Sequence, residues 1–307
     1  MSVTAHAEPL CTRAAEPTVA LRIEGRAKDL GDGFRVRRLL PAAERRTVGP
    51  FIFFDHMGPV QMPRGRGLDV RPHPHINLAT LTWLFEGEIL HRDSLGSEQL
   101  IRPGALNWMT AGRGIVHSER SPGAARAAGA SLHGLQLWVA LPRAHEETAP
   151  SFQHHPADEI PSLESDGAQL RLIAGSAYGL TSPARVLSPL FYVEAALEPG
   201  AALELPREHA ERAAYVVEGR VTCDSETHAP GRMLVFREGA AAALHADEAS
   251  RVALIGGAPL DGERHIWWNF VSSSRERIER AKGDWKSGRF PKVPGDEIEF
   301  IPLPETI

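Results

Sequence analysis

The 307-residue sequence predicts an all-β protein made of two tandem β-barrels, followed by a short C-terminal helix and an extended tail. Three observations support this fold class. Glycine contributes 28 residues and proline 24, which suits short strands joined by turns better than a helical bundle. Short apolar runs alternate with turn residues along most of the chain, and one strand-and-turn pattern occurs twice.

The first half of the chain contains the first predicted barrel. Residues 1–18 are small, polar and without a period, which predicts a disordered N-terminal tail. Residues 19–145 form the expected N-terminal domain. Within it, "FRVRRLLP" (34–41) predicts a short strand, and "VGPFIFFDHMGP" (48–59) predicts a buried strand that Gly-Pro ends. Strand and turn segments alternate from there to residue 145.

The second half begins after a change in composition. Residues 146–166 are polar and interrupted by proline, which predicts an interdomain linker. The β pattern resumes over residues 167–262, the expected C-terminal domain. Residues 263–307 are expected to form a helix and a tail, because "SSSRERIERAKGDW" (272–285) has a helical pattern with serine at its start.

An internal repeat relates the two halves. The segment "LTWLFEGEILHRDS" with "IRPGALNWMTAGRGIVHSE" matches "RAAYVVEGRVTCDSETHAPGRMLVFREGAAAALHADE" in the order of its strands, Glu-Gly, Asp-Ser and Pro-Gly turns and its His-x-acid end. Matching Gly87 to Gly219 and Gly104 to Gly231 requires only a change in loop length. Two copies of one antiparallel β module follow from this match.

Charge and cysteine content limit the partners and the location. The net charge of −5 and the pI of about 6.3 give no reason to expect direct nucleic-acid binding. The two cysteines, Cys11 and Cys223, suit a reducing compartment. The N-terminus lacks a signal-peptide pattern, and no apolar run approaches the roughly 18 residues of a membrane span. We therefore expect a cytoplasmic protein that binds no membrane.

The segment "RPHPHINLATL" (71–81) contains the first candidate metal ligands. His73 and His75 lie two positions apart, so both side chains project to the same side of an extended strand. The prolines before them favour extended backbone and stiffen this arrangement. A single His-x-His pair among 14 histidines is nevertheless more often structural than metal-binding.

A second pair with the same spacing strengthens the metal hypothesis. His117 and Glu119 in "GRGIVHSER" also share one face of a short extended segment. Two such strands can bring three imidazoles and one carboxylate to a single divalent ion. The set has no thiolate, which argues against a structural zinc site. Nitrogen with one oxygen suits Fe(II), Mn, Ni, Co, Cu or Zn, and ligand type alone does not choose among them.

The spacing of these residues resembles the two cupin motifs. Gly67, His73-Pro74-His75, Thr80 and Gly87 follow the first motif, with Thr80 where many cupins carry a glutamate ligand. The segment "GRGIVH" (112–117) resembles the second motif, with glycine in the usual proline place. Together with Glu119, "FFDHMGP" and "LQLWVALP", these motifs resemble the pirin family over roughly residues 20–285.

The resemblance implies a bicupin of two jelly-roll type barrels with a metal in the first. It implies one mononuclear iron, most often Fe(II), bound by the residues that match His73, His75, His117 and Glu119. It also implies that the C-terminal barrel has lost its metal. By the repeat, the corresponding positions of the second half are near Arg207, His209, His245 and Asp247. Because the cation of Arg207 would repel a divalent ion, we expect this second site to be empty.

The resemblance implies a function as well. Pirin-like proteins are similar to quercetin 2,3-dioxygenases, which open the flavonol ring with O2 and release carbon monoxide. A small aromatic substrate such as a flavonol, together with O2, is therefore expected. Glu119 is the ligand that could loosen and accept the proton of the 3-hydroxyl, acting as the catalytic base. Apolar and polar candidates for the substrate pocket are Phe53, His56, Trp108 and Met109, although a barrel-core role is more common for each of these residue types.

A second hypothesis belongs to a different class. Some pirins are described as iron-dependent regulators, so the chain could be a redox-sensing regulatory protein that binds a protein partner. Both hypotheses require the same four ligands, and the motifs do not separate them. The enzyme is favoured because the net charge gives no reason to expect DNA binding and no tail resembles a docking motif.

Overall fold

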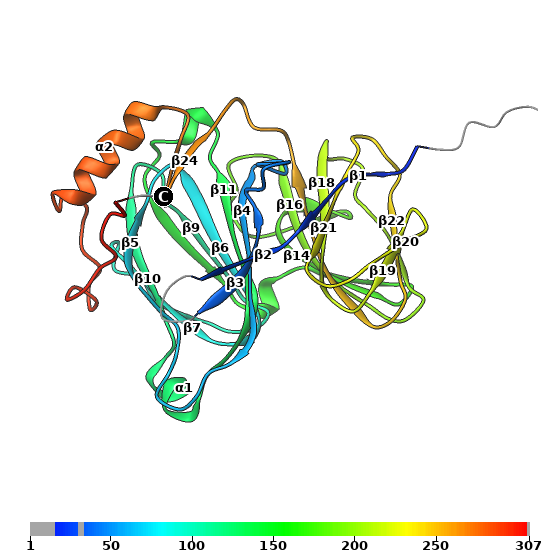
Figure 1. Ribbon diagram of the computed structural model, residues 1–307, viewed down its shortest axis with the longest axis horizontal. Coiled ribbons are helices and arrows are strands. Elements are labelled where there is room, and N and C mark those ends of the chain that lie inside the picture. The colour runs from blue at the N-terminus through cyan, green and yellow to red at the C-terminus, as the bar shows by residue number, and fades with distance from the viewer. Residues whose placement is uncertain (1–15, 30–33, 306–307) are drawn as a thin grey trace, which may run out of the picture.

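The computed structural model describes residues 16–29 and 34–305, so most of the predicted disordered tail and Cys11 lie outside the described residues. Two β-barrels lie side by side along the long axis of the molecule (Figure 1), which confirms the all-β tandem-barrel prediction. Within these described ranges, neither α-helix is long and apolar enough to cross a membrane.

The first barrel is built from a larger and a smaller antiparallel sheet. The larger sheet has the order β12 (Ser151–His155), β9 (Leu106–Thr110), β6 (Leu78–Gly87), β11 (Ser131–Ala140), β4 (Phe51–Gln61), β3 (Arg35–Leu40) and β2 (Arg26–Asp29). The smaller sheet has the order β5 (Asp69–His75), β10 (Ile115–Arg120), β7 (Ile89–Asp93) and β8 (Glu98–Ile101). The candidate ligands lie on the smaller sheet.

The second barrel repeats this arrangement. Its larger sheet has the order β1 (Val19–Glu24), β21 (Arg232–Phe236), β18 (Glu211–Glu218), β23 (Ser250–Gly257), β16 (Leu190–Leu197), β14 (Ala168–Ala177) and β13 (Ser162–Ser165), with β15 (Leu180–Thr181) paired to β14. Its smaller sheet has the order β17 (Ala202–Glu204), β22 (Ala243–Ala246), β19 (Val221–Cys223) and β20 (Glu226–His228).

The matched glycines of the repeat close equivalent turns. Gly87 ends β6 with φ of +85°, and Gly219 follows β18 with φ of +73°. These left-handed values favour glycine. A Cβ on Gly87 would also lie 2.0 Å from the carbonyl oxygen of Ser131. The sequence repeat therefore matches Gly87 to Gly219 because both barrels require a left-handed residue at the end of the equivalent strand.

The helices lie outside the barrels. The α-helices are α1 (Gly123–Ala128) and α2 (Arg275–Lys286), and short 3-10 turns span Arg143–His145 and Ala157–Glu159. As predicted, a serine begins the C-terminal helix, since the Ser274 hydroxyl accepts the Arg277 N–H at 3.1 Å. A two-stranded ribbon, β24 (His265–Trp267) and β25 (Phe270–Ser272), comes just before α2.

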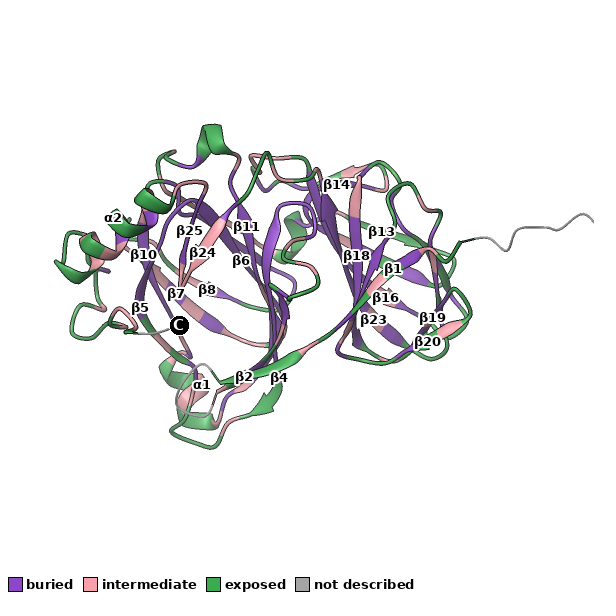
Figure 2. Ribbon diagram, turned by 45° about the horizontal axis from the view of Figure 1, so that its top comes forward, coloured by how far each residue is buried: buried purple, intermediate pink, exposed green. Residues whose placement is uncertain are grey.

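A shared apolar core joins the two barrels. It combines Leu81 and Trp83 of β6 with Tyr192 of β16, Tyr215 of β18 and Ile255 of β23, and all of these side chains are buried. Figure 2 shows buried strands facing one another between the barrels. Side chains alternate along β6, so the residues between these core positions face the interior of the first barrel. Each large sheet thus contributes one face to a barrel interior and the other to the interface.

Two features of the structure bear on the predicted domain boundaries. Strand β1 pairs with β21 of the second barrel, although residue 19 was assigned to the first domain. Residues 146–166 contain two edge strands rather than only a linker, because β12 pairs with β9 and β13 pairs with β14. Edge strands are half-exposed and can be polar, so composition alone does not distinguish them from a linker.

The C-terminal segment returns to the first barrel. A parallel bridge joins Phe270 to Ile76, and the backbone N–H of Ile301 donates to the carbonyl of Pro72 at 2.9 Å. Arg264 and Glu146 form a buried ion pair at 2.9 Å. Residues distant in sequence from the candidate ligands therefore pack directly against the strand that carries two of them.

Candidate metal centre

Two adjacent strands of the smaller sheet bring three histidines together. Strand β5 carries His73 and His75, and β10 carries His117. The strands pair antiparallel with His117 opposite His73 and Ile115 opposite His75. All three imidazoles are buried, with at most 6% of each residue exposed. The i, i+2 spacing in the sequence thus projects these side chains to the barrel interior.

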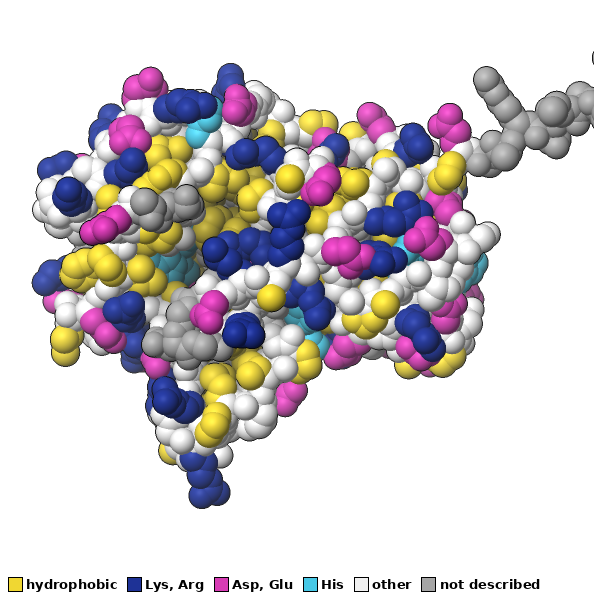
Figure 3. Space-filling model, viewed as in Figure 1, with side chains coloured by type: hydrophobic (Ala, Val, Ile, Leu, Met, Phe, Trp, Pro, Cys, Tyr) yellow, Lys and Arg dark blue, Asp and Glu magenta, His cyan; other side chains and the backbone are white. Residues whose placement is uncertain are grey.

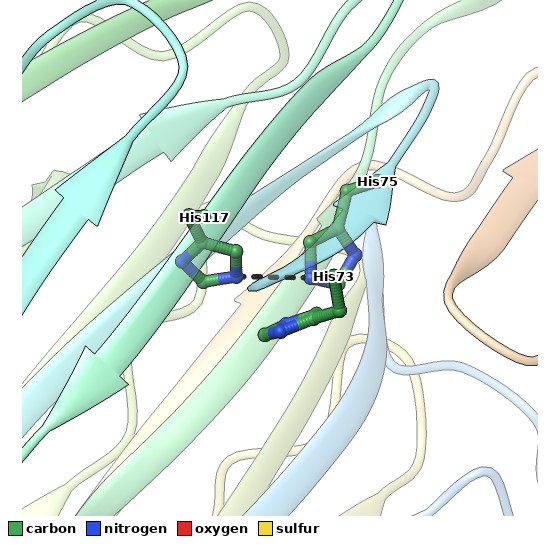
Figure 4. Close-up of side chains that lie close together, drawn as sticks. All are labelled: His73, His75 and His117. Carbon is green, nitrogen blue, oxygen red and sulfur yellow. Dashed lines mark hydrogen bonds between the residues drawn. The ribbon is translucent and has the colours of Figure 1, made fainter. Parts of the chain in front are cut away.

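The three imidazoles face a common point (Figure 4). One nitrogen from each of His73, His75 and His117 lies within 4.8 Å of the others, and Nε2 of His75 lies 3.1 Å from Nε2 of His117. Among the described residues, this is the one cluster of three or more histidine, cysteine or acidic side chains with such geometry. It is the candidate metal centre of the protein.

The outer nitrogens of these imidazoles have partners that set their tautomers. Nδ1–H of His73 donates to the carbonyl of Arg71 at 2.9 Å, and Nδ1–H of His75 donates to the carbonyl of Asn269 at 3.1 Å. A carbonyl only accepts, so Nε2 of each ring carries a lone pair. This arrangement is typical of histidines that bind a metal through Nε2.

The electrostatics of the cluster fit a cation. Burial lowers the pKa of His73 to about 4 and lowers the pKa values of His75 and His117 well below their ordinary value. The rings are therefore neutral near pH 7, which is the form that binds metals. Nε2 of His75 and Nε2 of His117 lie 3.1 Å apart, close enough to share a proton or to bind one divalent ion. The donor set, three neutral imidazoles without a thiolate, suits Fe(II), Mn, Ni, Co, Cu or Zn.

Glu119 is close in sequence but is not part of this three-histidine cluster. Its residue is 9% exposed, and its Oε1 lies 3.3 Å from the Thr82 hydroxyl, which is closer, at 2.8 Å, to Oε1 of Gln136. The pairing of β10 with β5 changes register between His117 and Glu119. Strand alternation therefore does not fix the direction of the Glu119 side chain relative to that of His117. Burial raises the pKa of the Glu119 carboxyl. Its predicted role as the fourth ligand stays a proposal.

The sequence interpretation missed a buried pair beside the cluster. His91 and Asp93 lie on β7, which pairs with β10, and Nε2 of His91 is 3.1 Å from Oδ2 of Asp93. Nδ1 of His91 is 3.5 Å from Nδ1 of His117. Burial would raise the pKa of Asp93, but the hydrogen bonds from His91, Ser97 and Leu95 outweigh it and lower the pKa. The i, i+2 spacing that identified the ligands also occurs in "HRD" and could have found this pair.

An aromatic wall extends from the cluster along the larger sheet. The Trp138 ring lies 5.0 Å from the His75 ring, and Phe53 stacks on Trp138 at 4.0 Å. The Arg38 guanidinium lies 4.3 Å above Phe53 and is fixed by two 2.8 Å hydrogen bonds to Asp55. Figure 3 shows a hollow on this side of the molecule, with an apolar floor, a visible histidine and Lys or Arg side chains on its rim over β2 and β3.

The predicted pocket residues fall into two groups. Phe53 and Met109 belong to the apolar cluster that contains Trp138, next to the histidines. His56 and Trp108 face the second barrel instead, which corrects their assignment to the pocket. His56 is hydrogen-bonded to Tyr215 at 2.7 Å, and Trp108 lies in the shared core. Strand alternation causes this division, because adjacent residues of β4 and β9 point to opposite faces.

The corresponding positions of the second barrel do not converge. Arg207 is exposed and lies 3.5 Å from Glu204, while Nε2 of His209 donates to the carbonyl of Ser176 at 2.9 Å. His245 is exposed, and Asp247 accepts a hydrogen bond from the Thr222 hydroxyl. Arg207, His209 and Asp247 thus have other partners, and His245 is exposed. The absence of a metal from the C-terminal barrel stays a prediction from the sequence.

Comparisons with known proteins agree with the fold. The family models described as Pirin and Pirin C-terminal cupin domain match residues 33–139 and 192–291. A pirin-like protein of Caulobacter vibrioides is 53% identical over 291 residues, covering 94% of this chain and all of the relative. A crystal structure of quercetin 2,3-dioxygenase from Acinetobacter baumannii is 34% identical, with a TM-score of 0.86 and coverage of 94% and 96%.

A more distant structure shares only the fold. The bacterial pirin YhhW of Escherichia coli, solved in complex with nickel(II), is 20% identical with a TM-score of 0.61, and the match covers 78% of this chain and 99% of YhhW. The same conclusion follows from the two family models, from a relative identical at more than half of the aligned positions and from the tandem barrels. The chain belongs to the pirin family of tandem cupin proteins.

Proposed function

We propose that this chain is a metal-dependent dioxygenase of the quercetin 2,3-dioxygenase type, with Fe(II) as its ion and a flavonol as its substrate. The observation that carries this proposal is the convergence of three buried imidazole nitrogens beside an aromatic wall. The likeness to the Acinetobacter baumannii quercetin 2,3-dioxygenase supports the reaction class. Fold alone would not, because cupin barrels carry many chemistries.

In this proposal four residues hold the ion, and one of them, Glu119, also moves a proton. His73, His75 and His117 would hold the ion, with Glu119 as the fourth ligand. A bound divalent ion supplies Lewis acidity toward the oxygens of the substrate. Glu119 would accept the proton of the 3-hydroxyl and act as the general base. The Thr82 hydroxyl lies 3.3 Å from Oε1 of Glu119.

The aromatic wall fits a planar substrate. Phe53 and Trp138 lie next to the histidines, and each has 8% of its residue exposed. An aromatic substrate that packs offset or edge-on against such side chains gains about 0.5–1.5 kcal/mol per ring pair. The Arg38 guanidinium packs on Phe53 and is paired with Asp55, which holds the Phe53 ring in place beside Trp138.

The test is turnover of quercetin by metal-loaded protein. Protein loaded with Fe(II) is mixed with quercetin under air, and loss of the flavonol absorbance is followed together with carbon monoxide release. We expect both signals, and we expect His75→Ala to abolish them and to lose stoichiometric metal binding. The matched control is His209→Ala in the second barrel, which should retain both. Full metal occupancy in His75→Ala would show that the ligand assignment is wrong.

The regulatory alternative has a distinct outcome in the same experiment. No turnover with Fe(II), Mn, Ni, Co, Cu or Zn, combined with one tightly bound ion per chain, would exclude the flavonol dioxygenase. That result would favour an iron-dependent regulator that binds a protein partner. The cytoplasmic location stays a prediction from the sequence.

A further inference from the structure

His91 is a buried imidazole beside the candidate metal centre, and the proposed function gives it no role. It lies on β7 as the cross-strand neighbour of Glu119 on β10. The residue is 4% exposed, and its ring centroid lies 5.3 Å from that of His117. A buried polar ring requires hydrogen-bond partners for its nitrogens.

Both nitrogens of His91 have polar partners, and these contacts link Asp93 through His91 to His117. Nε2 lies 3.1 Å from Oδ2 of Asp93, and Nδ1 lies 3.5 Å from Nδ1 of His117. The other oxygen of Asp93 accepts the backbone N–H groups of Leu95 at 2.8 Å and Ser97 at 3.1 Å. The turn after β7 therefore fixes the carboxylate and leaves one oxygen for His91.

These contacts determine which ring nitrogens of His91 and His117 carry a hydrogen. The carboxylate of Asp93 only accepts, so Nε2 of His91 carries a hydrogen. With that hydrogen as its one N–H, the His91 ring has a lone pair on Nδ1, which can accept from Nδ1–H of His117. The remaining nitrogen of His117, Nε2, consequently carries a lone pair and faces Nε2 of His75. Asp93 thus determines which nitrogen of His117 is available to a metal, through one intervening ring.

Packing holds the His91 ring in this orientation. Phe152 on β12 stacks against it with ring centroids 4.4 Å apart and an interplanar angle of 16°. His73 and His75 differ from His117, because their Nδ1 partners are the backbone carbonyls of Arg71 and Asn269. His117 is therefore the member of the triad whose orienting partner is a side chain, and substitution can remove it.

We propose that Asp93 and His91 are positioning residues that fix the tautomer and ring orientation of His117 and thereby set the metal affinity of the site. The inference rests on the metal-binding part of the proposed function and does not require dioxygenase activity. Phe152 completes the arrangement by preventing rotation of the His91 ring. Residues with this role in other metal sites change affinity by roughly 10–100-fold when removed.

The test measures Co(II) affinity by chelator competition and the visible absorption of the Co(II) site. Asp93→Asn retains the shape of the side chain, but its amide can donate to His91 and so no longer dictates the tautomer. We expect roughly 10–100-fold weaker binding for Asp93→Asn and for His91→Leu, with an altered Co(II) spectrum. His91→Gln should retain more affinity than His91→Leu, since its amide oxygen can accept from His117.

The matched control is His133→Leu. His133 is also 4% exposed and hydrogen-bonded, but its partner is His56 at the interface between the barrels. This control should lose stability without a change in Co(II) affinity or spectrum. The ¹⁵N chemical shifts of His117 supply a second readout, because they should show Nδ1–H in the parent protein and a mixed tautomer in Asp93→Asn. If His91→Leu fails to fold, the volume-conserving Asp93→Asn supplies both readouts.

Two results overturn the inference, and they differ in what they say about the site. Parent protein that binds Co(II), with Asp93→Asn and His91→Leu within twofold of it and an unchanged spectrum, would refute the positioning role alone. Parent protein that binds no Co(II), Fe(II) or Ni(II) would refute the metal centre itself and the proposed function with it.

Discussion

The Nδ1–H of His75 donates to the carbonyl oxygen of Asn269, 3.1 Å away in space and 194 positions later in the chain. The next residue, Phe270, is fully buried and bridges to Ile76, the residue after His75. The C-terminal segment therefore orients a candidate ligand of the first barrel. A metal centre that the sequence places within residues 73–119 depends on a contact from residue 269.

Phe270→Leu tests this dependence. The substitution removes ring volume from the cluster of Phe270, Ile278 and Ala281, and we expect a loss of about 1–2 kcal/mol of stability. Metal affinity should fall severalfold as well, because Asn269 loses its fixed position. The matched control is Phe191→Leu, which alters an equally buried ring in the second barrel. Equal metal affinity in the two variants, measured by chelator competition, would contradict the dependence.

The sequence predicts those parts of the site that depend on local spacing. The i, i+2 pairs place His73 and His75 on one strand and His117 on its neighbour, and the repeat predicts two barrels. The same rule would have identified His91 and Asp93, but the pair lacked the surrounding cupin motif that drew attention to the others. The register shift after His117 has no local signal, so the direction of Glu119 was not predictable.

Long-range contacts could not be predicted from the sequence. The pairing of β1 with β21 joins residues more than 200 positions apart, and the contact of Asn269 with His75 is similar in separation. The polar character of residues 151–155 hides an edge strand whose Phe152 stacks on His91. In each case the determining factor is the tertiary position of a segment, which local composition does not encode.

Phe53→Leu tests the aromatic wall, with its neighbour Phe54→Leu as the control. Phe53 faces the metal cluster and stacks on Trp138, whereas Phe54 faces the shared core and packs edge-on against Tyr215. We expect Phe53→Leu to raise the KM for quercetin roughly threefold to tenfold, since about 1 kcal/mol of stacking is lost. Phe54→Leu should lower stability and leave KM unchanged. The reverse pattern in steady-state kinetics would place the substrate elsewhere.

The interface between the barrels predicts a pH-dependent stability. His56 is buried between Tyr215 and His133, with ring nitrogens 2.7 and 2.8 Å from its two partners. Burial, with further contributions from His133 and Arg37, lowers the pKa of His56 to about 3. The unfolded chain, with an ordinary histidine pKa near 6.5, binds more protons between pH 6.5 and 3. The free energy of unfolding therefore decreases as the pH is lowered through this window, by about 1.4 kcal/mol per pH unit for this group.

His56→Gln should reduce this slope. Urea unfolding of the metal-free protein between pH 4 and 7 measures it, and the glutamine variant should lose stability on acidification less steeply by close to one proton. Above pH 6.5 the difference between the two proteins should stay constant, because His56 is neutral in both states. An identical slope in both proteins would show that His56 is not titrating on unfolding.

Arg212 occupies a ligand position of the second barrel. Seven residues before Gly87 is Thr80, where many cupins carry a glutamate ligand, and seven residues before the matched Gly219 is Arg212. Its residue is fully buried, and its guanidinium donates to the carbonyls of Pro206 at 3.2 Å and of Arg237 and Ala240 at 2.9 Å. The Arg212 guanidinium thus links two loops of the second barrel, at the position that corresponds to the metal cluster of the first.

Arg212→Met should therefore destabilise the protein without creating a second metal site. Three carbonyls lose a buried donor, and we expect a loss of about 2–4 kcal/mol. Arg207→Met, which alters an exposed arginine 3.5 Å from Glu204, should change stability by less than about 0.5 kcal/mol. Metal stoichiometry should stay at one per chain in both variants, because His245 is exposed and His209 is bound to a carbonyl. A second bound ion in Arg212→Met would show instead that this one cation keeps a competent site closed.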